Sequence, residues 1–144
     1  MTTITAHPSR SAVVDLLQRS GLPTADLTDE RLEDFFFAGT GNAPFGVVGL
    51  ELSPPHGLLR SLAVDDQARS GGLGSALLAY AEAYAHARGV NSLYLLTTTA
   101  ERFFAARGYG RTARSEAPSS IRLSSEFTEL CPASAIFMMK HLQE

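Results

Sequence analysis

The chain has 144 residues, of which 44% are hydrophobic and 19% charged, and its formal net charge is −3 at pH 7. A chain of this length and composition buries its own core, which excludes a disordered segment and argues against a nucleic-acid or anionic-membrane partner. The single cysteine, Cys131, excludes an internal disulfide, and no stretch approaches the roughly 18 apolar residues of a membrane span, so we expect a soluble cytoplasmic protein. No pattern of cysteines or histidines indicates a metal site, and we expect none.

The first forty residues predict one short strand and two helices. TITAH is extended in character, and the helical pattern that follows it places Val13, Leu16 and Leu17 on one face. Thr28 is followed by two acidic residues and indicates the start of a second, short helix, because a threonine hydroxyl caps free amides and acids suit the positive helix end.

The next part of the chain alternates apolar runs with turn sequences, which predicts an antiparallel meander. The runs are FFFAGT (35–40), FGVVGLEL (45–52) and LLRSLAV (58–64), and the turns between them are GNAP and SPPHG. A helical pattern then extends from Leu73 to Gly89.

The remaining elements continue this alternation of strand and helix to the end of the chain. They are a strand at SLYLLT (92–97), a helix at AERFFAAR (100–107), an extended stretch at YGRTAR (109–114), a short helix capped by Ser124 and a last strand at ASAIFMMKHL (133–142). A meander followed by a strand-helix crossover predicts an α/β fold with a mixed central sheet and helices on both faces. With no repeat or linker, we expect one domain over residues 1–144.

The glycine-rich stretch VDDQARSGGLGSALL (64–78) lies between a predicted strand and a predicted helix. A P-loop is excluded, because it requires a lysine after its last glycine and the chain has no lysine before Lys140. A dinucleotide fingerprint is disfavoured by Leu77, where a small residue is required, and by threonines where an acid is required. The pattern that remains is Arg69-x-x-Gly72-x-Gly74. Its backbone amides are suited to bind a pyrophosphate. The alternative is that its glycines serve only to make a tight turn between the strand and the helix.

This stretch resembles the acetyl-CoA-binding motif Arg/Gln-x-x-Gly-x-Gly/Ala of the GCN5-related N-acetyltransferase (GNAT) family, and the element order resembles that family over nearly the whole chain. The resemblance implies acetyl-CoA as cosubstrate, a pantetheine arm paired with the end of the LLRSLAV strand, and a gap between that strand and SLYLLTT that admits the thioester. The cofactor-binding residues that it implies are Leu62, Ala63, Val64, Arg69, Ser70, Gly71, Gly72, Leu73, Gly74, Ser75 and Phe104.

Phe104 departs from the pattern of many family members, in which a tyrosine in Ala-x-x-Phe-Tyr-x-x-x-Gly-Phe acts as the general acid. The matching segment here extends from Ala100 to Tyr109 and places a phenylalanine where that tyrosine stands. Another group or solvent must then protonate the leaving thiolate, or the chain is a non-catalytic acyl-CoA-binding sensor. Tyr109 and Tyr94 are the nearest substitutes, with core packing as the alternative for both, and Tyr109 is our candidate acid.

Three polar residues on the predicted meander are candidates for chemistry. Glu51, at the end of FGVVGLEL, is a candidate general base, with an ordinary surface charge as the alternative. Arg60 and Ser61 interrupt an apolar strand, and because an unpaired buried arginine is costly, we expect an anionic partner. That partner is a substrate group, or Glu51 on the adjacent strand, or each in turn.

The segment APSSIRLSSEFTELCPASAIFMMKHL (117–142), with LLRSL and LYLLTTTAERFF, is similar to the arsenic-resistance-associated branch of the family. The resemblance implies a small-molecule amine acceptor, such as an organoarsenical amino acid analogue, whose anionic head group suits Arg60 or Arg122. Cys131 is one thiol where arsenite takes two or three, so we expect it to be a buried apolar residue. The apolar last strand favours a homodimer.

Overall fold

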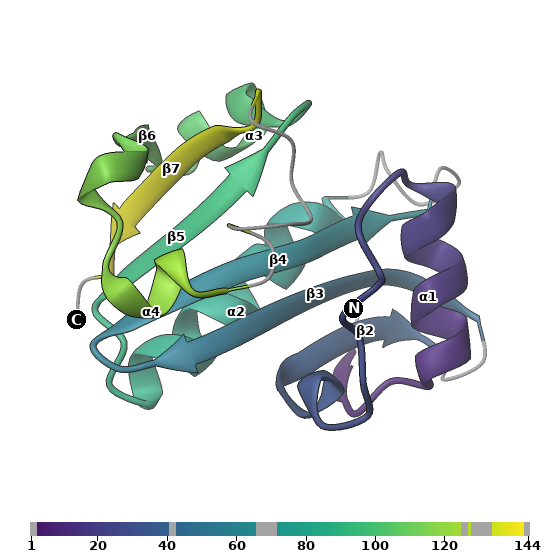
Figure 1. Cartoon of the computed structure of the whole chain (residues 1–144). Coiled ribbons are helices and arrows are strands. Elements are labelled where there is room, and N and C mark those ends of the chain that lie inside the picture. The colour runs from purple at the N-terminus through teal and green to yellow at the C-terminus, as the bar shows by residue number, and fades with distance from the viewer. Residues whose placement is uncertain (1–2, 41–42, 66–71, 125–126, 128–133, 143–144) are drawn as a thin grey trace. The chain divides into compact units, whose positions relative to one another are not determined.

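A computed structural model of the chain describes residues 3–40, 43–65, 72–124, 127 and 134–142 (Figure 1). The strands are β1 (Ile4–Ala6), β2 (Phe35–Gly39), β3 (Pro44–Ser53), β4 (His56–Val64), β5 (Ser92–Thr97), β6 (Gly110–Arg111) and β7 (Ile136–His141). The helices are α1 (Arg10–Arg19), α2 (Leu73–Ala87), α3 (Glu101–Ala105) and α4 (Ser119–Arg122), with 3-10 turns η1 (Arg31–Asp34) and η3 (Arg114–Glu116).

The strands form a mixed sheet in the order β1-β2-β3-β4-β5-β7-β6. β1 pairs with β2 and β2 with β3 in antiparallel fashion, while β5 and β6 are both antiparallel to β7. β4 and β5 are parallel, with His56–Leu58 paired with Ser92–Tyr94. The predicted mixed α/β sheet is therefore confirmed. A parallel pair needs a crossover connection, and α2 supplies it.

Backbone contacts divide the chain into two compact units. The first consists of residues 1–51 and 59–84, and the second of residues 52–58 and 85–144. One domain over residues 1–144 stays a prediction.

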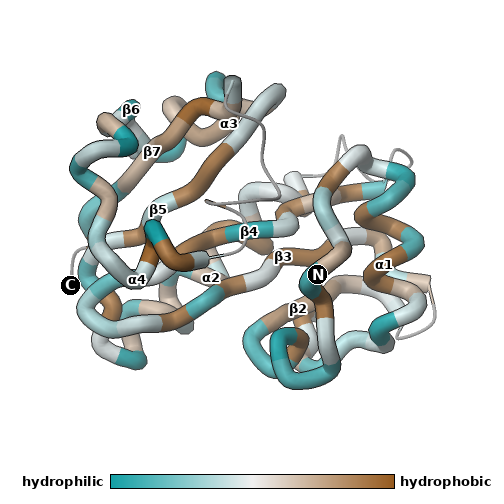
Figure 2. The backbone as a smooth tube through the Cα atoms, in the orientation of Figure 1, coloured by the Kyte–Doolittle hydropathy of each residue, from teal (hydrophilic) through white to brown (hydrophobic). Residues whose placement is uncertain are grey.

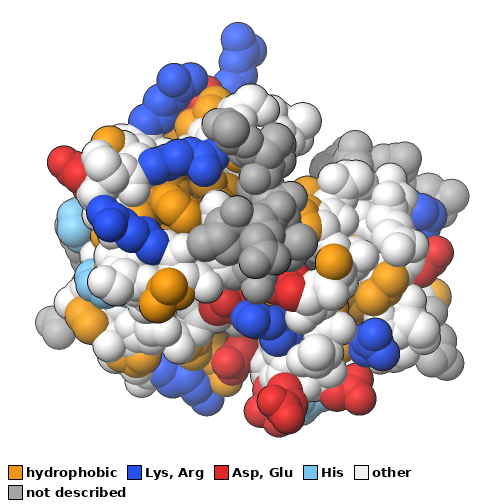
Figure 3. Space-filling view, viewed as in Figure 1, with side chains coloured by type: hydrophobic (Ala, Val, Ile, Leu, Met, Phe, Trp, Pro, Cys, Tyr) orange, Lys and Arg blue, Asp and Glu red, His pale blue; other side chains and the backbone are white. Residues whose placement is uncertain are grey.

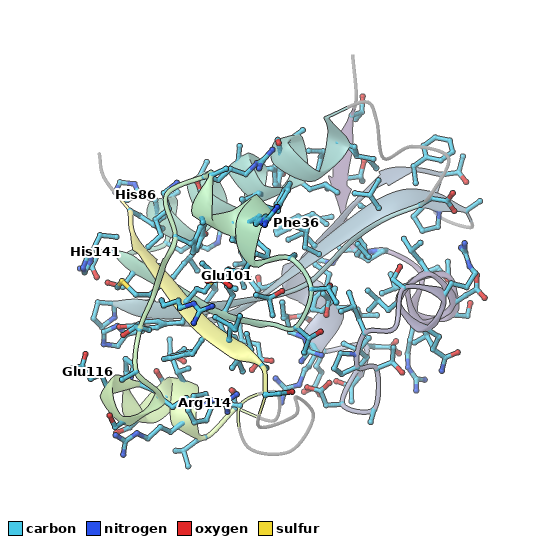
Figure 4. The ribbon with its side chains drawn as sticks, turned by 90° about the horizontal axis from the view of Figure 1, so that it is seen from above. Phe36, His86, Glu101, Arg114, Glu116 and His141 are labelled. Carbon is cyan, nitrogen blue, oxygen red and sulfur yellow. The ribbon has the colours of Figure 1, made fainter. Side chains whose placement is uncertain are left out.

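In the first unit, strand alternation sends neighbouring side chains of β2 to opposite faces of the sheet. Phe35 packs in a core with α1 residues and with Val47, whereas the Phe36 ring meets Tyr80 and Tyr84 of α2 at centroid distances of 5.0 and 4.6 Å. Figure 4 shows α1 and α2 on opposite sides of the strands, and Figure 2 shows hydrophobic residues along β3 between them. The helix face predicted from Val13, Leu16 and Leu17 is buried as expected.

A glycine of β3 makes room for Phe35, one of the largest core side chains of this unit. A Cβ at Gly49 would lie 2.3 Å from the Phe35 ring, so any larger residue at this position displaces that ring. Since Phe35 is fully buried, the glycine fixes where β2 and its core partners lie against β3.

The second helix predicted near residue 30 is only a 3-10 turn. Thr28 Oγ1 accepts a hydrogen bond from the Arg31 N–H at 3.3 Å, but η1 begins only at Arg31, its N-cap position is Glu30 and no side chain caps it. η1 ends after four residues, where the β2 strand begins at Phe35. The hydrogen bond from Thr28 matters for the site because it holds the backbone of Arg31.

In the second unit, the face of the sheet under α4 carries an aromatic core. Tyr94 and Phe137 stack at 5.5 Å with an interplanar angle of 14°, and Ala117 and Ile121 of the covering segment pack on them. Ser124 Oγ accepts from the Phe127 N–H at 3.3 Å, as expected for a cap, and the rest of that predicted helix lies outside the described residues. α4 itself, over Ser119–Arg122, was not anticipated.

Basic side chains gather over β6, β7 and α4 in the second unit (Figure 3). Several of them fasten the chain to itself: Arg114 donates to the Ala135 carbonyl at 2.8 Å, Arg122 to that of Ser115 at 2.5 Å, and Lys140 to that of Arg107 at 3.0 Å. Figure 4 shows Arg114 and Glu116 on the side of β7 that carries α4. The side chains of Arg114, Arg122 and Lys140 therefore bind backbone carbonyls of the same unit.

Candidate functional site

The site in the first unit begins with an irregularity in β4. Ser61 has a φ of +60°, a left-handed conformation that residues with a side chain seldom adopt. Arg60 lies 5.9 Å from the Phe35 ring centroid, and Ala63 packs in the same core as Phe35. In a regular strand, Arg60 and Ala63 are three residues apart and would therefore lie on opposite faces of the sheet. Because both lie near Phe35, we infer that the strand contains one extra residue between them, as in a β-bulge. The bulge directs Arg60 into the core.

Arg60 is the centre of an ion-pair cluster. Its side chain is 0% exposed, and its guanidinium binds Asp26 in a two-pronged contact of 2.5 Å (Nη1 to Oδ2) and 2.8 Å (Nη2 to Oδ1). Nη1 also donates to Glu51 Oε2 at 2.9 Å, and Nε donates to Ser61 Oγ at 3.1 Å. The structure therefore brings together Glu51, Arg60 and Ser61, which the sequence analysis singled out separately.

Arg31 adds a second cation on the solvent side of this cluster. Its Nη1 lies 2.8 Å from Glu51 Oε1, and its Nε lies 3.5 Å from Asp26 Oδ2. Side-chain exposure rises outward from 0% at Arg60 through 11% at Asp26 and 20% at Glu51 to 35% at Arg31. Glu51 thus lies between two guanidiniums, one buried and one at the surface.

Asp26 and Arg31 were missed by the sequence analysis. Both come from a polar stretch, TADLTDERLED, in which nothing distinguishes a side chain that turns inward from one that faces water. The buried Arg60 was the available signal, because a desolvated guanidinium requires more than one acceptor. That requirement predicts a second carboxylate without saying where it comes from.

The charges of the cluster act on Asp26. Burial of this carboxyl raises its pKa, but the hydrogen bonds and positive charge of Arg60, together with the charge of Arg31, outweigh burial and hold the pKa below its ordinary value. Asp26 is therefore a carboxylate at every pH near neutrality.

This lowered pKa predicts how stability depends on pH. A carboxyl whose pKa is lower when folded contributes stability above its unfolded pKa, about 3.9, and the contribution is lost as pH falls through the folded pKa. We expect the difference in unfolding free energy between wild type and Asp26→Asn, measured by urea denaturation, to be full at pH 7 and to shrink below about pH 4. A difference that is unchanged at pH 3 contradicts the assignment.

The segments expected to hold the cofactor's pantetheine and pyrophosphate lie partly in the same unit. Leu62, Ala63 and Val64 complete β4 after the bulge, and Gly72 precedes α2 with a φ of +77°. A Cβ built on Gly72 meets nothing within 4 Å, and the Ala76 N–H donates to the Gly72 carbonyl at 3.1 Å. The amides of Leu73 and Gly74 precede that first helical bond, an arrangement that fits an approaching anion.

Other predicted residues of the cofactor seat are only partly covered by the structure. Ser75 lies in the first turn of α2 and is half-buried. Arg69, Ser70 and Gly71, and also Cys131, lie outside the described residues.

Near the end of β4, a cavity of about 190 Å³ lies beside an exposed ion-pair group. Arg19 of α1 contacts Asp15 and Asp65 at 3.1 Å each, with 55% of its side chain exposed. Arg19, like Arg31, lies between two carboxylates, but it is not part of the Arg60 cluster and so provides a matched comparison for it.

The second unit holds the other predicted site residues. Phe104 is buried in α3 with its ring 5.6 Å from that of Tyr109, which is 3% exposed and lies under Lys140. Arg122 is exposed on α4. Tyr94 is buried among aromatic rings, and burial, with a smaller effect of the Glu116 charge, raises its pKa. The catalytic role of Tyr109 and the binding role of Arg122 stay predictions.

Two features are absent among the described residues. No helix in the described part of the chain is long and apolar enough to cross a membrane. Within the same residues, no three or more His, Cys, Asp or Glu side chains are grouped so as to hold a metal ion.

The chain is similar to known proteins both in sequence and in fold. The model of the acetyltransferase (GNAT) family matches residues 7–111, and no curated protein matches the chain. Among solved structures, N-acetylglutamate synthase from Neisseria gonorrhoeae, complexed with coenzyme A and N-acetyl-glutamate, is similar with a TM-score of 0.82 and 21% identity. The similarity covers 100% of this chain and 36% of the synthase, so this chain spans about a third of that protein.

Two further structures are similar over their whole length. Rv2747 from Mycobacterium tuberculosis, in complex with CoA and NLQ, has a TM-score of 0.75 at 17% identity, covering 98% of this chain and 99% of its own. The ribosomal-protein-S18-alanine N-acetyltransferase from Escherichia coli has a TM-score of 0.69 at 18% identity. The similarity covers 100% of this chain and 96% of the E. coli enzyme. At these identities the likeness concerns the fold.

Proposed function

Because the chain belongs to the acetyltransferase (GNAT) family, with acetyl-CoA as its cosubstrate, we propose that it acetylates the amine of a small molecule by direct attack. The amine nitrogen bonds to the thioester carbonyl carbon, the carbon–sulfur bond breaks, the nitrogen loses a proton and the thiolate gains one. The observation that carries the proposal is Glu51 at the partly exposed end of the Arg60 cluster, in the unit that also contains the predicted seat of the cofactor.

Each residue has a distinct role in this proposal. Glu51 takes the proton of the acceptor amine, directly or through a water molecule, because its carboxylate is partly exposed at 20%. The amides at the start of α2 hold the pyrophosphate, supported by the open space over Gly72. Tyr109 returns a proton to the thiolate, in place of the tyrosine that Phe104 replaces.

The acceptor that we propose is an amino acid analogue with an anionic group, including organoarsenicals of the arsenic-resistance branch. Arg60 and Ser61 are candidates for the anionic group, but both oxygens of Asp26 and one of Glu51 already bind Arg60, so a substrate anion must displace one of them. Arg122, which is exposed and whose hydrogen bond goes to the Ser115 carbonyl, is the candidate that binds an anion without displacing a carboxylate. A cytoplasmic location and a homodimer belong to the same proposal.

The test is thiol release from acetyl-CoA by the purified full chain, over a panel of amino acids, diamines, and arsenical and phosphinic amino acids. We expect release above the rate without acceptor for at least one anionic amine, and a loss of about 10²-fold in kcat for Glu51→Gln with that acceptor. If no acceptor in the panel raises the rate, the proposed activity is wrong. If Glu51→Gln keeps both its rate and its pH profile, the base is another group.

A second candidate function is a non-catalytic acyl-CoA sensor, which Phe104 favours. Phe104 is 6% exposed, its ring lies 5.6 Å from that of Tyr109, and it carries no hydroxyl where many family members have one. Calorimetric titration with acetyl-CoA, on the sample used for turnover, separates the candidates. Binding without turnover supports the sensor, and turnover excludes it.

A further inference from the structure

The Arg60 cluster holds the Glu51 carboxylate by both of its oxygens. Oε2 accepts from buried Arg60 and Oε1 lies 2.8 Å from Arg31, a partner from a different element. A carboxylate fixed in this way has a defined direction, whereas a free glutamate at a strand end samples several rotamers. The position of Glu51 therefore depends on what fixes each of the two arginines.

Asp26 fixes Arg60. It binds both terminal nitrogens of the guanidinium, whereas Glu51 shares only Nη1, at 2.9 Å. A planar guanidinium held by a two-pronged contact cannot rotate without breaking it. If Asp26 were neutral, Arg60 would lose its two-pronged acceptor, and its guanidinium would bind the Glu51 carboxylate more tightly.

Asp26 also balances the positive charge around Glu51. The charged groups in contact with Glu51 or its partners include Arg60 on β4, Arg31 on η1 and Asp26 in the turn before η1. Two cations act on Glu51, and Asp26 offsets one of them at contact distance from both. A base held by two uncompensated cations takes up a proton less readily.

We infer that Asp26 and Arg31 are positioning residues for Glu51: Asp26 acts through Arg60 and offsets the charge of that cation beside Glu51, and Arg31 acts directly as the second cation. The inference rests on the proposed function, in which Glu51 is the base. It gives the two residues opposite effects on one observable, the acid limb of the pH profile of kcat/KM.

The test compares Asp26→Asn and Arg31→Gln with wild type, using the best acceptor of the panel and a second acceptor whose amine has a different pKa. We expect the acid limb to move to lower pH in Asp26→Asn, which removes a negative charge near the base. We expect it to move to higher pH in Arg31→Gln, which removes a positive one. Each shift should be about one pH unit, and should be the same with both acceptors.

Arg19→Gln is the matched control, since Arg19 also lies between two carboxylates and is 55% exposed. It should leave the profile unchanged, and Asp26→Glu should restore most of what Asp26→Asn changes. Arg31→Gln leaves the buried contacts of Arg60 intact, so it tests the role of Arg31 even if Asp26→Asn fails to fold.

The outcomes distinguish a failure of the proposed acetyl transfer from a failure of the positioning roles of Asp26 and Arg31. A wild-type chain that transfers no acetyl group overturns the proposed function. An active wild type whose acid limb moves in neither variant, or in the same direction in both, overturns the positioning roles. Opposite shifts with an unchanged Arg19→Gln profile support them.

Discussion

Replacing Arg60 with methionine is expected to lower the free energy of unfolding by about 3–5 kcal/mol at pH 7. Methionine keeps the unbranched apolar stem of arginine but not the guanidinium that lies over the Phe35 ring, so the loss reports mainly on charge and its hydrogen bonds. Asp26 and Glu51, with 11% and 20% exposure, would be left facing each other's negative charge in place of a shared cation. Arg31 alone, at the surface, compensates only part of it.

Urea denaturation followed by circular dichroism measures this loss. Arg19→Met, in the exposed Asp15–Arg19–Asp65 group, is the control and should change the midpoint little, because exposed pairs are screened by water. The deficit of Arg60→Met should diminish toward pH 4, where the stranded carboxyls take up protons. A deficit below about 1 kcal/mol would mean that the buried guanidinium is not needed to neutralise them.

A triple replacement separates the charge of the cluster from its volume. With Arg60→Met, Asp26→Leu and Glu51→Met combined, no buried charge is left unpaired, and we expect most of the lost stability to return. Acetyl transfer should not return with it, because the proposed base is gone. Stability without activity would show that the cluster is retained for chemistry.

Replacing Gly72 with aspartate is expected to weaken acetyl-CoA binding by about 10²-fold or more, the second large effect. A negative charge at a helix N-terminus that binds an anion repels the anionic ligand. The aspartate carboxylate would also accept hydrogen bonds from the helix amides that are expected to bind the pyrophosphate. The left-handed φ of +77° adds backbone strain for any side chain. Isothermal titration with acetyl-CoA gives the change in Kd.

Gly72→Asn is the control for this change, because asparagine has the same size and tolerates a positive φ but carries no charge. We expect it to lose much less affinity than Gly72→Asp, and both variants to keep the unfolding midpoint within a few degrees of each other. Since a Cβ at Gly72 meets nothing within 4 Å, a folding defect is not expected. Equal affinity in all three proteins would refute the pyrophosphate seat.

Most elements of the fold were predictable from local pattern. The runs 35–40, 45–52 and 58–64 became β2, β3 and β4, and the periodic stretch after Leu73 became α2, because alternation and 3.6-residue periodicity report directly on which side chains are buried. α4 was missed because four residues are too few to show a period. The η1 turn was expected to be longer, since the threonine and acidic residues that predicted a helix start say nothing of where the helix ends.

The site was predictable only where a residue broke the pattern of its own element. Arg60 was noticed because it interrupts an apolar strand, and Glu51 because it is a charged residue near the end of one. Asp26 and Arg31 break no pattern, since charged residues are ordinary in a polar turn, and their role arises from contacts with β3 and β4 across the fold. The bulge at Ser61 was equally hidden, because serine carries no preference for a positive φ that the sequence would reveal.

The mutual dependence of the four charges in the Arg60 cluster constrains how this sequence diverges. Loss of Arg60 alone strands two carboxylates, and loss of Asp26 alone leaves Arg60 with fewer acceptors, so each single step passes through a destabilised intermediate. Arg31, at 35% exposure, is the member whose replacement costs least and is the natural first step. Relatives of this chain should therefore vary first at position 31, and positions 26, 51 and 60 should change together or not at all.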